Sequence, residues 1–83
     1  MTNTVYNNID NILFTSRERV KKSAISLFFG NQPKETIIDI EGDLINQVAK
    51  ELNKIVPNKR KATTKAKYVV NTFIEDFMRQ IQQ

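Results

Sequence analysis

The sequence predicts a mainly α-helical protein in which a short strand is followed by two helices and preceded by an additional N-terminal helical segment. Three observations lead to this fold class. Apolar residues recur at helical spacing along most of the chain, and Ile38 and Ile40 alternate with polar residues as in a strand. Two breaks, at 30–33 and 57–58, each contain a proline, which interrupts a helix.

The first 30 residues predict a helix over about 16–29, after a weaker helical turn. Thr15 and Glu18 match a capping box, in which the two side chains bond to backbone amides at a helix start. Apolar residues then follow on one helical face: Val20, Ala24, Leu27 and Phe28. The competing interpretation is a strand over 24–29, because this stretch is rich in β-branched and aromatic residues.

Gly30 stands where a helix C-cap glycine belongs. Phe28 and Phe29 precede it at the end of the apolar stripe. Because phenylalanine is usually buried, we expect both rings in the core. The alternative is that they stack on bases, as in proteins that bind single strands.

The second segment begins with the predicted strand, 36–41, and Gly42 closes it. From Asp43 the apolar period becomes that of a helix: Leu44, Val48, Leu52 and Ile55. This helix is expected to end near Val56, because Pro57 disfavours helical geometry in the residue before it.

The third segment, which follows the break at 57–58, is predicted to form a helix whose N-cap is Thr63 or Thr64. Its apolar face is too wide for one neighbouring helix to cover, so we expect a second subunit. A chain of 83 residues without cysteine also gains stability most readily from oligomerisation. The sequence therefore predicts a homodimer with these interface residues: Ile38, Ile40, Val70, Phe73, Ile74 and Phe77.

The composition argues against an enzyme. Histidine and cysteine are both absent, which removes the commonest general base and the soft metal ligands. Asp39, Glu41 and Asp43 could hold a hard cation, but favourable charge at a helix N-terminus explains them more simply. We expect no cofactor and no metal. The chain also lacks a signal peptide and any long apolar run, which predicts a cytoplasmic protein that does not bind membranes.

The charge balance favours an anionic partner. The net charge is +4 and the isoelectric point is about 9.6. Basic residues cluster at the start of the third helix, where they oppose the helix dipole but suit a phosphate. The candidate nucleic-acid-binding residues here are Lys59, Arg60, Lys61, Thr63, Thr64, Lys65 and Lys67. The alternative is an ordinary solvated loop.

A smaller basic cluster lies at the start of the first predicted helix. It supplies four further candidates for nucleic-acid binding: Arg17, Arg19, Lys21 and Lys22. The alternative, a solvated polar face, is equally consistent with a short run of charges.

The order strand, helix, helix over residues 35–79 resembles the ribbon-helix-helix superfamily of DNA-binding proteins. Ile38 and Ile40 look like its ribbon core, and Thr63-Thr64 followed by an apolar helix is similar to its second helix. The resemblance implies a dimer whose ribbon, with Glu35 or Lys34, Ile37 and Asp39 facing outward, enters the major groove. Thr63 and Thr64 would hold a phosphate, with Lys61 and Lys65 assisting. Residues 43–49 and 62–66 also look like the helical start of HU-type nucleoid proteins.

The sequence thus predicts a small, basic, dimeric protein that binds duplex DNA, such as a transcriptional regulator or partition factor of a virus or plasmid. Residues 1–32 would form an N-terminal helical extension, and 33–83 the DNA-binding and dimerisation domain. The alternative function is a helical adaptor that binds an acidic partner protein, for example one of a host.

Overall fold

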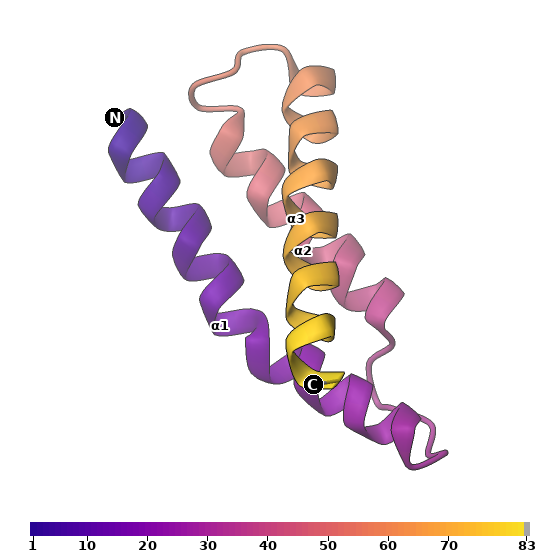
Figure 1. The fold of residues 1–83 in the computed structure, drawn as a ribbon. Helices are drawn as coiled ribbons and strands as arrows, with labels where there is room; N and C mark the ends of the chain where they lie inside the picture. Colours follow the sequence, from indigo (N-terminus) through magenta and orange to yellow (C-terminus); the bar gives the residue numbers. More distant parts are fainter. Residues whose placement is uncertain (83) are drawn as a thin grey trace.

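Three α-helices account for most of residues 1–82, which the computed structural model describes (Figure 1). Helix α1 spans Thr2–Phe28, α2 spans Ile37–Leu52 and α3 spans Lys59–Gln82. Helices α2 and α3 run in opposite directions and pack most extensively on each other, and α1 packs against both. No residue from 1 to 82 forms a strand.

The predicted strand at 36–41 is wrong, because these residues begin α2. Thr36 is the N-cap, and its hydroxyl oxygen accepts a hydrogen bond of 3.0 Å from the backbone N–H of Asp39. The Asp39 carboxylate lies in the first turn, where negative charge suits the helix dipole. Local capping therefore favours the helix in a segment whose isoleucines favour a strand.

The isoleucines of this segment belong to a helix and do not form the core of a ribbon. Ile40 is fully buried and continues toward Leu44 with helical spacing, whereas Ile38 is 79% exposed. Without a strand there is no ribbon to enter a DNA groove. The ribbon-helix-helix fold is therefore excluded, and the fold is all-α.

Helix α1 begins well before the predicted start at residue 16. The Thr15 hydroxyl donates to the carbonyl of Asn11 at 2.9 Å, and the Ser16 hydroxyl donates to that of Leu13 at 2.7 Å. Both side chains thus bond within a continuous helix and cap nothing. Such bonds bend helices, and α1 changes direction near its middle (Figure 1).

The C-terminal end of α1 forms as predicted. Gly30 has a φ of 73°, a conformation that glycine adopts without a steric penalty. Its N–H bonds to the carbonyl of Leu27, and the N–H of Asn31 bonds to that of Ser26 at 2.8 Å. This pair of bonds is the Schellman motif, which satisfies the last carbonyls of the helix.

The other two helix boundaries also differ from expectation. Helix α2 ends at Leu52, and residues 53–55 form a turn. Helix α3 begins at Lys59, where the side-chain oxygen of Asn58 accepts from the N–H of Lys61 at 3.1 Å. Asn58 therefore caps the helix in place of Thr63 or Thr64.

All three helices contribute to one hydrophobic core. The buried apolar residues are Val5, Ile9, Val20 and Ala24 of α1, Ile40, Leu44, Val48 and Leu52 of α2, and Ala62, Ala66, Val70 and Ile74 of α3. The predicted boundary at residue 32 does not separate two cores, because α1 supplies a third of these side chains.

The residues predicted at a dimer interface are divided between core and surface. Ile40, Val70 and Ile74 are buried within one chain, so they need no second subunit to cover them. Phe73 and Phe77 are half-buried, with stacked rings 6.0 Å apart. The homodimer stays a prediction, but the apolar face that motivated it is partly covered by α1 and α2.

Candidate nucleic-acid interface

The positive charge of the protein is concentrated in one stretch of sequence. Residues 52–74, here called the basic segment, carry six cations and no acid, whereas the remaining residues together carry a net charge of −2. Lys54, at one edge, pairs with Glu51 at 2.9 Å. Hydrogen bonds from Lys54 and from Asn8 lower the pKa of Glu51, so these bonds favour the ionised form of its carboxyl group.

The other five cations of the basic segment are exposed on α3: Lys59, Arg60, Lys61, Lys65 and Lys67. None of them forms an ion pair with a residue in the described part of the chain. Their charges are therefore free to interact with an external anion.

Two parallel rows of exposed side chains run along the outer side of α3, because residues three and four apart share a helix face. One row contains Arg60, Thr64, Lys67 and Asn71, and the other Lys61, Lys65, Tyr68 and Thr72. We call these eight residues the basic face. Tyr68 is 74% exposed and lies between lysines and polar residues, so its ring is available to a ligand.

The start of α3 adds backbone donors to this charge. Its first turn contains no acidic residue. The N–H groups of Lys59 and Arg60 have no carbonyl within the helix to bond to, as in the first turn of any helix. The positive end of the helix dipole also lies here, so the cations cost stability but favour a phosphate.

Thr63 and Thr64 lie one turn inside α3 and not at its N-terminus, where the sequence predicts them. The Thr63 hydroxyl donates to the carbonyl of Lys59, and the Thr64 hydroxyl to that of Arg60, both at 3.0 Å. Each hydroxyl proton is thus already used within the helix. In this conformation neither hydroxyl can donate to a phosphate oxygen.

The smaller basic cluster on α1 is divided. The Arg17 guanidinium lies 5.0 Å from the centre of the Phe77 ring and 5.6 Å from that of Phe14, within the range of cation–π attraction. Lys21 and Lys22 are exposed. Arg17 therefore makes contacts within the protein, and so does Arg19, whose contacts are described next.

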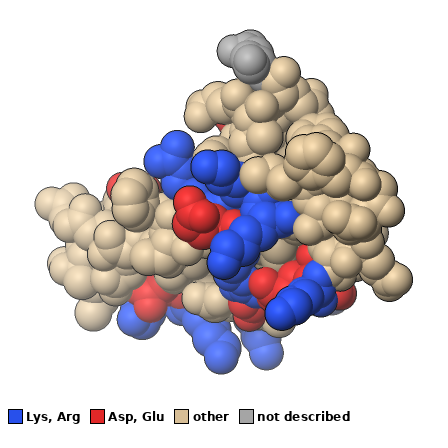
Figure 2. Space-filling view, turned by 90° about the horizontal axis from the view of Figure 1, so that it is seen from below, with Lys and Arg blue, Asp and Glu red and all other residues tan. Residues whose placement is uncertain are grey.

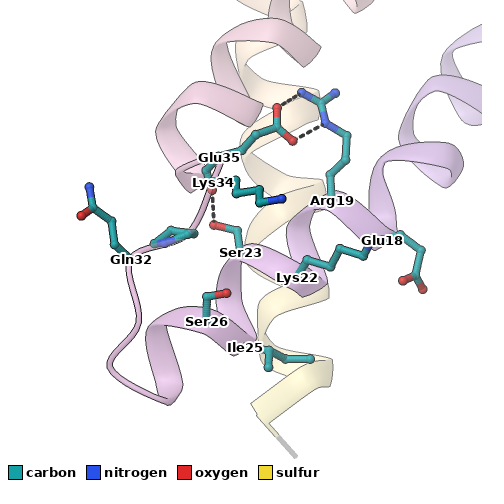
Figure 3. A pocket seen from close by; sticks show the side chains of 10 residues that line it. Glu18, Arg19, Lys22, Ser23, Ile25, Ser26, Gln32, Lys34 and Glu35 are labelled. Atoms are coloured by element: carbon teal, nitrogen blue, oxygen red, sulfur yellow. Dashed lines mark hydrogen bonds and ion pairs between the residues drawn. The ribbon is translucent and has the colours of Figure 1, made fainter.

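Arg19 joins α1 to the segment before α2 and to α2 itself. Its Nε and Nη2 donate to the two carboxylate oxygens of Glu35, at 3.0 and 2.6 Å (Figure 3). Its Nη1 lies 2.9 Å from Asp43. The hydrogen bonds from Arg19 lower the pKa of Glu35. The Ser23 hydroxyl also donates to the Glu35 carbonyl, at 2.8 Å. We call Arg19, Glu35 and Asp43 the Arg19 cluster.

The two basic clusters are separated along α3. Arg17 contacts Phe77, which is 10 residues beyond Lys67 and 18 beyond Lys59, or about 15 and 27 Å along the helix axis. Figure 2 views the molecule from the end opposite to the start of α3, and there Lys and Arg are interspersed with Asp and Glu. The structure therefore does not bring the predicted binding residues together on one surface.

The acidic residues 39, 41 and 43 form no cation site. Asp43 pairs with Arg19, and Asp39 lies in the first turn of α2. Among the described residues, no three potential metal ligands come together. Within the same residues, no helix is both long and apolar enough to cross a membrane.

Comparison with known proteins found no matching family model, no matching curated protein and no matching solved structure. Neither resemblance noted in the sequence gains support from these comparisons.

The sequence analysis missed one exposed surface. Phe28 and Phe29 were expected in the core, but both are exposed, as are Ile25 and Leu27. The signal was present in the sequence, because these four residues spread over more than half of the helix circumference instead of forming one narrow stripe. A helix that lies on the surface of a core can bury only one side of such a set.

Proposed function

We propose that this protein binds duplex DNA through the basic face of α3, together with Lys59 at the helix start. The observation that carries the proposal is the separation of charge: five exposed, unpaired cations on one helix, in a segment without acids, on a chain that is otherwise slightly acidic. Phosphate contacts supply most of the affinity of a protein for nucleic acid, and lysine and arginine make them.

The shape of α3 supports duplex DNA as the ligand. An α-helix fits the major groove, and α3 has 24 residues, of which the first half carries the cations. Asn71 and Thr72 follow the cations along the same face and are exposed. Their amide and hydroxyl groups can bond to base edges, whereas the cations hold phosphates.

The test is the salt dependence of binding, measured by fluorescence anisotropy on a labelled duplex. If each of the five cations neutralises one phosphate, the slope of log K against log salt is about −4.5 per chain. The variant Lys59→Gln/Arg60→Gln/Lys61→Gln leaves two cations, and its slope is expected to fall to about −1.8. Affinity should drop equally on specific and random duplexes, because phosphate contacts do not read sequence.

A matched control removes the same charge from the other end of the molecule. Lys21→Gln/Lys22→Gln/Lys34→Gln also deletes three cations, all exposed. This variant is expected to keep most of the affinity and nearly the whole slope. Equal losses in the two variants would mean that net charge, and not the basic face, determines binding. Unchanged binding by the α3 variant would refute the proposal and favour an acidic protein as the partner.

A further inference from the structure

The C-terminal end of α1 is apolar over more than half of its circumference, and Ser26 is the one polar residue among 25–29. Ile25, Phe28 and Phe29 point away from the core, and Leu27 lies on the side that faces the core but is also exposed. Phe29 is 77% exposed. We call these four residues the apolar end. Exposed apolar residues gathered in one patch mark a surface that interacts with another molecule or with a membrane.

The apolar end projects beyond the core. The last buried residue of α1 is Ala24, one turn before Phe28. In Figure 1 this end extends at the lower right past the neighbouring helices, and the corresponding area at the right of Figure 2 carries no charge. The Schellman motif at Gly30 closes the helix here, so the projection is a defined structure.

Lysines lie directly behind the apolar end. Lys21 is one turn before Ile25 on the same helix face. Lys22 and Lys34 lie on opposite walls of a groove of about 680 Å³ that Ile25 also lines (Figure 3). None of the three lysines forms an ion pair with a described residue, unlike Arg19 beside them. We call them the flanking lysines.

We infer that the apolar end and the flanking lysines bind the surface of an anionic phospholipid bilayer. From Ile25 to Phe29 the chain extends about 6 Å along the helix axis, so end-on insertion of these residues would reach the boundary between headgroups and acyl chains, which lies about 5–10 Å deep. The flanking lysines would then lie at the level of the headgroups, where they attract anionic lipids. This attachment is peripheral, so it departs from the expectation of no membrane binding, which rested on the lack of a long apolar run. It is independent of the proposed binding to DNA.

The charges favour a bilayer over a second copy of the chain. In a symmetric dimer through the apolar end, the flanking lysines of both copies would be brought close together and would repel each other. An anionic lipid surface instead neutralises them. The shape also favours a fluid medium, because the exposed apolar residues spread over more than half of the helix circumference, which is wider than a single flat protein face covers.

A tryptophan introduced at the apolar end tests this inference, because the chain has no tryptophan of its own. The emission of Phe29→Trp is measured with vesicles of equimolar phosphatidylcholine and phosphatidylserine. We expect a shift to shorter wavelength and protection from a water-soluble quencher. Tyr68→Trp, on the basic face of α3, is the matched control and should stay unprotected. Protection of Tyr68→Trp alone would show adsorption through α3 and would overturn the inference.

A second variant measures the contribution of the rings. Phe28→Ser/Phe29→Ser should weaken partitioning into the same vesicles at least about tenfold, because each buried phenylalanine contributes strongly to transfer from water. Circular dichroism checks that the variant folds, which we expect because both rings are exposed. Unchanged partitioning would overturn the inference. The inference would also be overturned by two results together: the wild type is a dimer that this variant dissociates, and vesicles leave the Phe29→Trp emission unshifted.

Discussion

Arg19 and Glu35 are joined by two parallel hydrogen bonds, so that a guanidinium on α1 holds a carboxylate 16 residues further along the chain. The same guanidinium reaches Asp43 on α2. Such bidentate pairs fix geometry as well as charge. The Arg19 cluster thereby sets the path of the segment that connects α1 to α2.

The pair makes stability depend on pH in acid. The pKa of Glu35 is lowered in the folded protein from its ordinary value of 4.5, so the ionised carboxylate favours folding. Its contribution is fully present above pH 4.5 and is lost as the pH falls through the lowered pKa. Glu35→Gln should therefore be less stable than wild type at neutral pH, and this difference should disappear in acid.

Urea unfolding at neutral pH and at a pH below the lowered pKa measures this effect, and added salt should reduce it because the pair is partly exposed. Glu18→Gln is the control. Glu18 is an exposed carboxylate on α1, the helix that carries Arg19, and it forms no ion pair with a described residue. A Glu35→Gln variant that keeps wild-type stability at neutral pH would show that the pair contributes nothing.

The two glycines should respond oppositely to alanine. Gly42 lies inside α2 with open space where a Cβ would be, so Gly42→Ala should raise the free energy of unfolding by about 0.5–1 kcal/mol. Gly30→Ala should lower it by about 1–2 kcal/mol, because φ at this position is 73°. Chemical denaturation of both variants gives the comparison, and destabilisation by Gly42→Ala would contradict α2 as described.

Two neighbouring isoleucines distinguish a helix from a strand at the start of α2. Ile40 is fully buried, and Ile40→Ala should cost about 2–5 kcal/mol of stability. Ile38 is exposed, and Ile38→Ala should change stability by less than about 0.5 kcal/mol. In a strand both residues would face the same side and both substitutions would be costly, so similar losses would argue for the strand.

The variant that weakens DNA binding should not weaken folding. The cations at 59, 60 and 61 oppose the dipole of α3, at a cost of about 0.3–1 kcal/mol each in low salt. Lys59→Gln/Arg60→Gln/Lys61→Gln should therefore melt at the same temperature as wild type or higher. Calorimetry at low and high salt checks this, because the gain should shrink as salt screens the dipole. A lower melting temperature would mean that these side chains stabilise the fold.

Much of the helical pattern could be predicted from the sequence, because each helix buries one face against its neighbours and the apolar residues recur on that face. Leu44, Val48 and Leu52 are buried on α2, and Val70 is buried on α3, as their spacing indicates. Gly30 ends α1 as predicted, because the left-handed backbone at a helix end nearly always selects glycine.

The errors arose where two local signals competed. At 36–41 the isoleucines favour a strand, whereas Thr36 and Asp39 form an N-cap that the sequence analysis does not include, and the packing of Ile40 stabilises the helix. At Thr15 the capping-box pattern was misleading, because the same hydroxyl can bond back within a helix. For the candidate site, the sequence located the basic residues but not the distance between their two clusters, which depends on how α1 crosses α3.

The topology has a consequence for the order of folding. Helices α2 and α3 are neighbours in sequence and pack most extensively, so their hairpin closes a short loop and should form early. The docked side of α1 includes two buried serines, and its attachment relies in part on the exposed Arg19 cluster. We therefore expect α1 to be the first unit to open. In hydrogen exchange, its amides should lose protection before those of α2, through an open form in which the hairpin remains intact.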